Sequence, residues 1–145
     1  MLKRAIAYRR KKNVIVHPSS QTTDGVWIVS EPCLVLDMSC SDREIGKAVA
    51  EALECSRTGV PHPIEWKGIV VPLLRAAGVK SWTTFAKNTT SVEVEADGNA
   101  LVLVPTKNLG TIEGFEPDLS GRKKLDRSAD DETTGKEVRQ LLARS

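Results

Sequence analysis

The chain has 145 residues, 40% of them hydrophobic, and its 21 lysine and arginine residues nearly balance 19 aspartate and glutamate residues. This length fits one domain, residues 1–145, that buries its own core without a metal or disulfide. Three cysteines, Cys33, Cys40 and Cys55, form no C-x-x-C pair, which favours a reducing, cytoplasmic location. No apolar run is long enough for a leader or a membrane span, so we expect no membrane association.

The near-neutral total charge of +2 hides an asymmetry along the chain. The first twelve residues hold six basic side chains: Lys3, Arg4, Arg9, Arg10, Lys11 and Lys12. The remainder has 15 basic and 19 acidic residues, a net charge of −4. The sequence therefore predicts a basic N-terminal segment, 1–12, on a mildly acidic body.

Short strands are predicted in the first quarter of the chain. Runs rich in branched apolar residues are typical of strands, and clusters of Ser, Thr, Asp and Gly are typical of loops. The predicted elements are strands at 4–8, 13–17, 26–30 and 33–37, with a charged turn at 9–12 and a polar loop at 18–25. An antiparallel meander is the economical interpretation.

Helices follow in the middle of the chain and at its end. Ser41 and Glu44 form a capping box, and the apolar residues after them recur with helical spacing. Ser81 can cap a shorter helix, and Pro72 suits the first turn of another. The predicted helices span 42–57, 72–77, 82–87 and 131–143, with a proline-containing loop at 58–68.

A β-hairpin is predicted at 91–105. Val92, Val94 and Ala96 alternate with polar residues, Asp97-Gly98-Asn99 reverses the chain, and 100–104 is continuously apolar, as in an inner strand. We expect a single α/β domain of the α+β type, in which a mainly antiparallel sheet packs against the helices. The charged composition of segment 118–130 favours mobility.

Catalytic patterns are sparse. His17 and His62 have no carboxylate at helical or strand spacing, and no phosphate-binding loop, zinc-protease or nucleophile-elbow motif occurs. Glu93 and Glu95 share one strand face, which is more typical of a solvated face than of an acid/base pair. We expect a protein without enzymatic activity, cofactor or metal. A small enzyme using Cys55 and His62 remains a distant alternative.

Two surfaces compete for a binding function. The basic segment 1–12, with Tyr8 as a stacking ring, could contact RNA phosphates, as in a ribonucleoprotein accessory protein. An acidic surface could instead cover the substrate cleft of a basic nuclease, and a loop tryptophan could anchor a protein partner. The candidate residues for binding a protein partner are Glu65, Trp66, Glu93, Glu95, Asp97 and Asp118.

Several segments together resemble the contact-dependent growth inhibition (CDI) immunity proteins of Gram-negative bacteria. They are VSEP at 29–32, the helix at 41–57 with Ile45-Gly46 and Ser56-Arg57, GVKSWTTF at 78–85, and the strand–DGN–strand followed by Pro105 and Asn108. The resemblance covers most of residues 25–118.

This resemblance implies a small cytoplasmic α/β protein that binds the toxin domain delivered by a neighbouring cell. Such toxins are commonly tRNA-cleaving or other nucleases, and the implied inhibition is occlusion of the active site in a 1:1 complex. Because the total charge is not strongly acidic, we expect contacts of mixed polarity rather than nucleic-acid mimicry. The sequence leaves self-association open.

Overall fold

The computed structural model describes residues 2–144 and has an α+β fold. Its strands are β1 (Lys3–Arg10), β2 (Asn13–Thr22), β3 (Trp27–Val29), β4 (Leu34–Asp37), β5 (Thr58–Val60), β6 (Thr90–Asp97), β7 (Ala100–Asn108), β8 (Phe115–Pro117) and β9 (Lys123–Asp126). Its helices are α1 (Asp42–Cys55), α2 (Val71–Ala77), α3 (Trp82–Ala86), α4 (Gly110–Glu113) and α5 (Asp131–Arg144), with a 3₁₀ turn, η1, at Leu119–Gly121.

The sheet is built around β1, which pairs antiparallel with β2 on one side and β6 on the other. The strand order along the sheet is β3-β2-β1-β6-β7-β8, with β4 and β5 also paired to β2 and β9 also paired to β7. Only the short β2–β5 pair is parallel among the described strands. As predicted, the strand after the DGN turn is internal, because β6 and β9 pair with its two edges.

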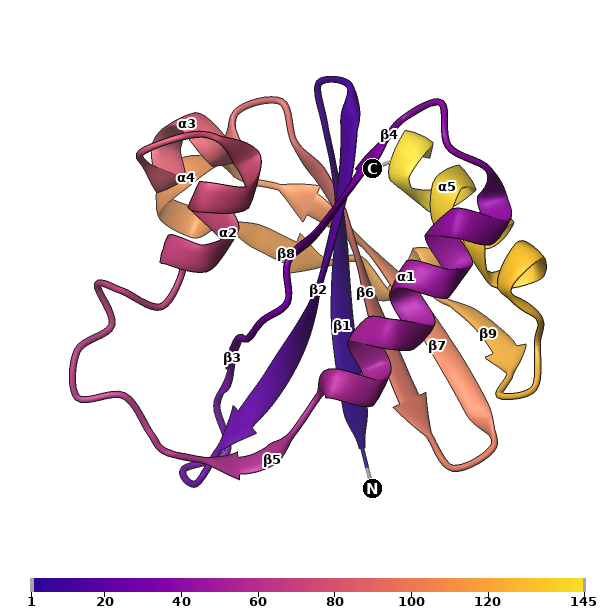
Figure 1. Ribbon diagram of the computed structural model, residues 1–145, viewed down its shortest axis with the longest axis horizontal. Coiled ribbons are helices and arrows are strands. Elements are labelled where there is room, and N and C mark those ends of the chain that lie inside the picture. Colours follow the sequence, from indigo (N-terminus) through magenta and orange to yellow (C-terminus); the bar gives the residue numbers. More distant parts are fainter. Residues whose placement is uncertain (1, 145) are drawn as a thin grey trace.

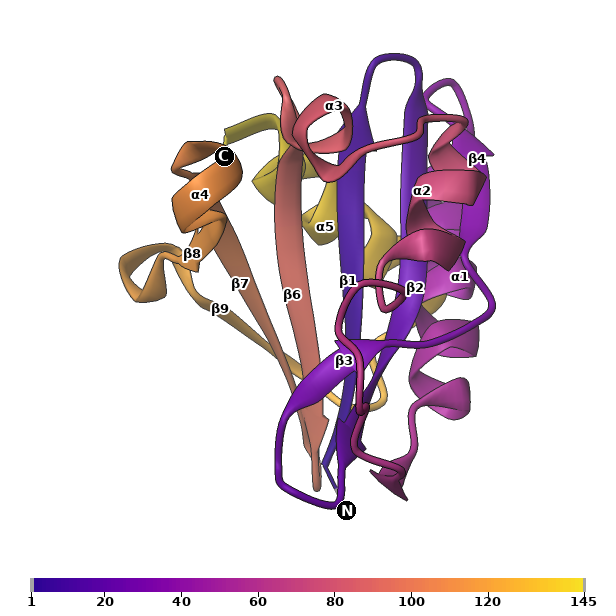
Figure 2. The same cartoon turned by 90° about the vertical axis from the view of Figure 1, so that its left-hand side faces the viewer.

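The helices lie on both faces of this sheet. The long helices α1 and α5 cover one face, and α2, α3 and α4 lie together at one end of the molecule (Figure 1). Turned by 90°, the view shows α2 and α3 over the upper ends of the central strands, with no helix in front of the lower halves of β1, β6 and β7 (Figure 2). The second face is therefore only partly covered by the described residues.

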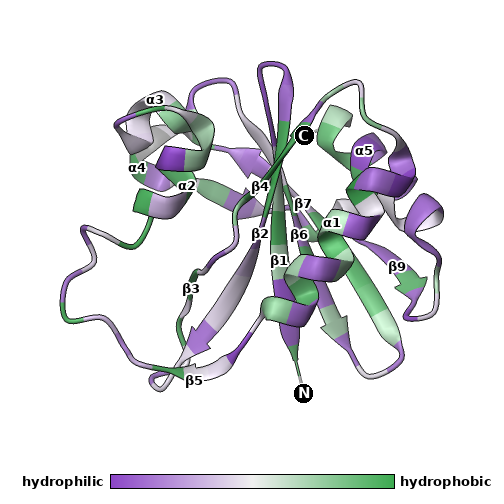
Figure 3. Ribbon diagram, in the orientation of Figure 1, coloured by the Kyte–Doolittle hydropathy of each residue, from purple (hydrophilic) through white to green (hydrophobic). Residues whose placement is uncertain are grey.

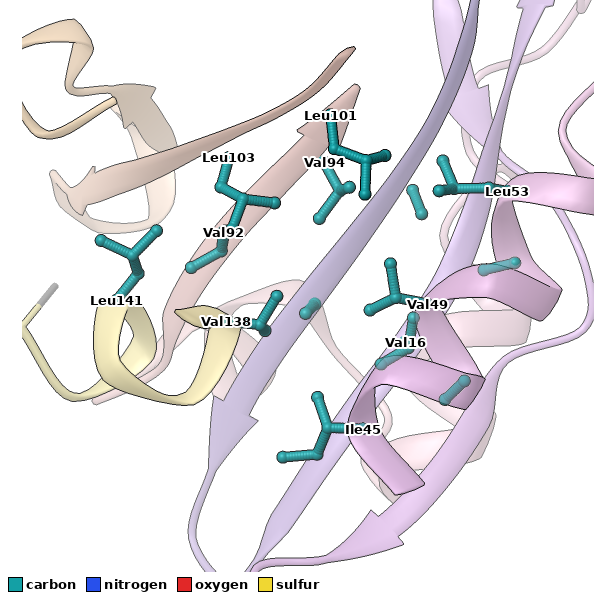
Figure 4. Close-up of a cluster of buried hydrophobic side chains, with 14 of the residues drawn as sticks. Val16, Ile45, Val49, Leu53, Val92, Val94, Leu101, Leu103, Val138 and Leu141 are labelled. Atoms are coloured by element: carbon teal, nitrogen blue, oxygen red, sulfur yellow. The ribbon is translucent and has the colours of Figure 1, made fainter. Parts of the chain in front are cut away.

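The main core lies between the sheet and the two long helices. Val92 and Val94 of β6 and Leu101 and Leu103 of β7 point toward the helices, where they meet residues such as Val138 (Figure 4). These strand residues are almost fully buried, because every second side chain of a strand points to the same face. The alternation read from the sequence thus places the core correctly.

Helices α1 and α5 touch through two glycines. A Cβ atom built on Gly46 would lie 1.8 Å from the carbonyl oxygen of Asp131, and one on Gly135 would lie 1.6 Å from that of Asp42. The two backbones are therefore in direct contact, at a separation that no residue with a side chain allows. Arg139 of α5 also links the two helices, because its Nε donates a hydrogen bond to Oδ1 of Asp42 in α1 at 2.7 Å.

A second apolar cluster lies under α2 and α3 on the opposite face. Phe85 packs edge-on against Tyr8, with ring centroids 5.0 Å apart. Tyr8 also stacks on His17, which is fully buried. Burial lowers the pKa of His17 to about 4 and keeps the ring neutral at physiological pH.

Two predicted loops contain strands. The polar stretch 18–25 was expected to be a loop, but β2 continues through it to Thr22, because β3 pairs with Ser19, Ser20 and Gln21. The predicted loop at 58–68 begins with β5, which pairs with the end of β2. In both places the pairing partner is distant or short, so the local composition gave no sign of it.

Other boundaries shift by one or two residues. Helix α1 ends at Cys55, because Ser56 is extended and its hydroxyl donates to Ser19 O at 2.6 Å. The region 106–120, which follows the predicted hairpin, contains α4 and the short strand β8. Segment 118–130, whose composition favours mobility, contains η1 and β9.

Candidate functional site

The uncovered part of the second sheet face carries a cluster of charged and apolar side chains. We call this surface the open face and define it by Arg4, Trp27, Glu93, Glu95, Asp97 and Val102. Strand pairing aligns its central members in one row, because Arg4 lies opposite Glu95 and Glu95 lies opposite Val102. Residues paired in this way point to the same side of the sheet.

An arginine links the acids to an aromatic ring. Arg4 Nη2 lies 3.1 Å from Glu95 Oε2, and the Arg4 guanidinium lies 5.0 Å from the centre of the Trp27 ring. Arg4 Nε is buried and has no hydrogen-bond partner among the described residues. The Arg4 side chain as a whole is 23% exposed, and its one ion pair does not use all five N–H donors of the guanidinium.

Glu93 lies on the same face, two residues before Glu95. Burial raises the pKa of Glu93, and the charge of Glu95 raises it further, while Arg4 opposes the shift. One arginine is thus shared between two carboxylates, which leaves the pair with excess negative charge when both are ionised. Asp97 extends the acidic row to the exposed end of the hairpin.

The predicted anchor, Trp66, lies in the loop between β5 and α2. This residue is 50% exposed, and its ring makes a T-shaped contact with His62, with centroids 5.2 Å apart. Glu65 is exposed beside it, and Ile64 is 99% exposed. Trp66 is therefore a projecting loop residue and not a lid on the core.

His62 is held in place by two polar contacts. Its Nδ1 lies 2.9 Å from Thr22 Oγ1, and its Nε2 lies 3.6 Å from Asp24 Oδ2. The carboxylate that sequence spacing did not reveal is therefore present, supplied by the β2–β3 turn. These contacts join the Trp66 loop to the strand end beside the open face.

Asp118 stands apart from the other candidate acids. It precedes η1, and its Oδ1 accepts hydrogen bonds from the backbone and hydroxyl of Ser120, the latter at 2.6 Å. This is the role of a turn-capping residue. The structure therefore brings Glu93, Glu95 and Asp97 together and leaves Asp118 on a different element.

The basic N-terminal segment is a central strand and not an arm. Lys3 Nζ donates to the carbonyls of Glu54 and Ser56 at the end of α1, while Arg4 lies on the open face. Arg10 lies at the opposite end of β1, roughly 20 Å away at 3.3 Å per residue. The six charges are divided between two ends of the molecule, so a continuous RNA-binding arm does not form.

The sequence placed Arg4 in the basic segment and did not connect it to the candidate acids. The apolar neighbours of Trp27 in the sequence predict a core position, but Trp27 is only half-buried and lies under the Arg4 guanidinium. The signal for Arg4 was present, because it alternates with Ala5 and Ala7, whose side chains face the helices. A basic residue in that alternation predicts a charged second face.

Groups for metal or redox chemistry do not converge in the described part of the chain. No cluster of three His, Cys, Asp or Glu residues there could hold a metal ion. The three cysteines are free, and burial raises the pKa of Cys33 to about 11, which makes its thiolate scarce at neutral pH. Across residues 2–144, no helix has the length and apolar character needed to cross a bilayer.

Comparisons with known proteins agree on the fold. The chain superposes on a protein of unknown function from Neisseria meningitidis with a TM-score of 0.82 and 19% identity, covering 99% of this chain and 95% of that one. It superposes on a chain of the CdiA-CT/CdiI toxin and immunity complex from Yersinia pseudotuberculosis with a TM-score of 0.81 and 16% identity, covering 99% and 97%. No curated protein sequence matches it.

The family assignment comes from the sequence itself. The family model described as CdiI, CDI immunity protein, matches residues 3–145, which is nearly the whole chain. The match includes both long helices, the central sheet and the open face. The chain therefore belongs to the CDI immunity protein family.

Proposed function

We propose that this chain binds and neutralises the toxin domain of a contact-dependent growth inhibition effector, and that the toxin is a nuclease, either tRNA-cleaving or of another kind. The family match over residues 3–145 is the observation that carries this proposal. The similar Yersinia pseudotuberculosis structure supports it, because it is described as a complex of toxin and immunity protein.

The open face and the Trp66 loop form the proposed toxin-binding surface. Sheet faces are normally covered, yet this half of the sheet presents a shared arginine, two carboxylates and a tryptophan side by side. Ile64 and Trp66 add exposed apolar area from the neighbouring loop. Aromatic anchors surrounded by polar groups are typical of tight protein interfaces.

Charge would guide the encounter. Glu93, Glu95 and Asp97 present a row of acids that attracts a protein with a positively charged, nucleic-acid-binding cleft. The partly exposed Arg4 guanidinium, whose N–H groups outnumber its one ion pair, would donate to a carbonyl or carboxylate of the same partner. This mixture of charges matches the mixed polarity expected from the composition.

Inhibition would follow from occlusion, without turnover by this chain. An interface of standard size, about 1,600 Å² in total, is large enough to cover an active-site cleft in a 1:1 complex. A few buried anchors can supply most of the binding energy. We assign Trp66 to this role and assign no catalytic step to any residue.

Purified toxin domain tests the proposal directly. The chain should bind it with 1:1 stoichiometry in calorimetry and stop its cleavage of RNA or DNA when equimolar. Replacing Trp66 (W66A) should weaken binding by about 2 kcal/mol, roughly thirtyfold, because an anchor is lost. Its unfolding free energy should change little, since the side chain contributes to neither core cluster.

Ile112→Ala is the matched control. Ile112 is 99% exposed, like Ile64, but lies on α4, away from the proposed surface. It should leave affinity unchanged. Equal losses in W66A and I112A would remove the Trp66 loop from the interface, and nuclease activity persisting under saturating binding would refute occlusion.

A further inference from the structure

A basic cavity lies at the end of the sheet opposite the hairpin acids. It has a volume of about 580 Å³ and lies between the β1–β2 turn, the α3–β6 connection and the last turn of α5. The residues that matter for its chemistry are Arg9, Arg10, Lys11, Lys87, Asn88 and Thr90. This volume falls within the range of small-molecule binding sites.

Arg10 supplies a buried charge to this cavity. The residue is only 7% exposed, and its guanidinium is held by the backbone, with Nε donating to Phe85 O at 3.3 Å and Nη2 to Thr84 O at 3.4 Å. No carboxylate forms an ion pair with it among the described residues. A buried guanidinium without a counter-ion is costly, and its remaining N–H groups are available to an anion.

Three further cations line the same cavity, and none of the described acidic side chains does. Arg9, Lys11 and Lys87 form no ion pair within the described chain, and the β1–β2 turn is strongly hydrophilic (Figure 3). Among the described residues, the negative charge nearby is the carbonyl end of α5, where Leu142 O accepts a hydrogen bond from Thr90 Oγ1 at 2.8 Å. Helix carbonyls carry only partial charge and cannot balance four cations.

Backbone strain gathers at the same place. Lys11 and Asn88 have positive φ angles, 53° and 56°, and they are the only non-glycine residues with positive φ among those described. Both line the cavity. Positive φ is required in a two-residue hairpin turn such as Lys11-Lys12 and is tolerated by asparagine, so these two turns fix the backbone that forms the rim of the cavity.

We propose that this cavity binds a phosphomonoester group. The planar fork of Arg10 suits phosphate oxygens, the mobile side chains of Lys11 and Lys87 can neutralise its second charge, and Thr90 and Asn88 supply polar contacts. The phosphate would belong to a small phosphorylated molecule or to the end of a nucleic acid. The site does not depend on the toxin-binding proposal, because the open face lies at the other end of β1.

Calorimetric titration at low salt tests this inference with five probes: inorganic phosphate, AMP, a 5′-phosphorylated tetranucleotide, its 5′-hydroxyl counterpart and, as an anion without phosphate, hexaglutamate. AMP should bind with a Kd of about 1 mM or tighter, and its affinity should fall as salt is added. Backbone amide signals of 9–11 and 87–90 should shift in NMR spectra. Much tighter binding of the phosphorylated tetranucleotide than of AMP would identify a nucleic-acid end as the source, and similar affinities would identify a small molecule.

Lys87→Ala and Lys11→Gly should each weaken AMP binding about tenfold, because each removes a charge-assisted contact, and glycine keeps the backbone angle at 11. Lys47→Ala, an exposed lysine of α1, is the control and should change nothing. The inference is overturned if no probe binds, or if K47A lowers the affinity for AMP as much as K87A does. It is also overturned if the 5′-hydroxyl tetranucleotide or hexaglutamate binds as tightly as the phosphorylated probes.

Discussion

The two faces of β1 and β6 show how one pair of strands serves two purposes. Toward α1 and α5 the strands present small or branched apolar residues that are almost fully buried, such as Ala5 and Val94. Toward the other side the neighbouring residues are Arg4, Glu93 and Glu95. In β6 the two sets alternate residue by residue, whereas in β1 Ile6 and Tyr8 follow Arg4 on the second face and belong to the cluster under α2 and α3.

The difference lies in what covers each face. The helix-covered face gains stability from burying apolar area, whereas the open face keeps partly buried charges that must be balanced by one another. The electrostatic interaction of Arg4 with two carboxylates contributes little to folding stability, but such charges can determine which partner binds. We therefore assign folding to the first face and recognition to the second.

The most disruptive change should be at the contact between α1 and α5. Replacing Gly46 with alanine would place a Cβ atom 1.8 Å from the backbone of Asp131, so the helices would have to separate. We expect a loss of about 3 kcal/mol in the free energy of unfolding. Chemical denaturation measures it.

Lys47→Ala is the control for this change, because Lys47 is the next residue of α1 and is exposed. It should alter stability by no more than about 0.5 kcal/mol. Gly135→Ala should reproduce the loss, since that glycine faces the backbone of Asp42. A stable G46A protein with unchanged helix packing would contradict the close contact described above.

Acid should weaken the second cluster through His17. Its pKa is about 4 in the folded protein and 6.5 ordinarily, so between these values the unfolded chain binds the proton and the folded chain does not. The unfolding free energy should therefore fall as the pH drops from 6.5 to 4, by an amount on the order of 3 kcal/mol. Nε2 is buried and has no hydrogen-bond partner among the described residues, so an N–H formed there on protonation would lack an acceptor.

Comparing the wild type with His17→Gln isolates this effect. Asp37, Asp126 and Asp130, whose pKa values are lowered by nearby hydrogen bonds, are common to both proteins and cancel. The difference between the two stability curves should shrink toward low pH. Parallel curves, or an NMR titration of the His17 ring near pH 6.5, would contradict the burial argument.

The smallest expected effect concerns the acids of the open face. Changing Glu93 and Glu95 to Gln and Asp97 to Asn should slow association with a basic toxin domain about tenfold at low salt and less at high salt. Glu51→Gln and Glu54→Gln on the exposed side of α1 provide the control. Stopped-flow or biosensor rates unaffected by the triple change would remove these acids from the encounter.

Periodicity made much of the fold predictable. The capping Ser41, whose hydroxyl accepts from the Glu44 amide at 3.1 Å, and the alternation at 91–97 mark their elements directly in the sequence. The α+β class, the long helices and the β6–β7 hairpin follow from such local signals. The shared face of Glu93 and Glu95 was predictable for the same reason.

The remainder depends on contacts distant in sequence. The strand at Ser19–Thr22 is polar and forms because β3 and β5 lie beside it. Arg4 meets Glu95 across 91 residues, and Gly46 meets Asp131 across two helices. No local sequence pattern predicts contacts between residues so far apart in the chain. The open face and the basic cavity are therefore visible only in the three-dimensional structure.

Growth of bacteria that express the toxin domain is the most direct test of the central claim, that this chain protects by binding the toxin over the open face. Cells that co-express the wild-type chain should grow, and so should cells with the control changes on α1. Cells with W66A combined with Glu93→Gln, Glu95→Gln and Asp97→Asn should lose protection while the chain remains folded and abundant. Full protection by that folded variant would contradict the assignment of the open face, and no protection by the wild type against its cognate toxin would contradict the proposed function.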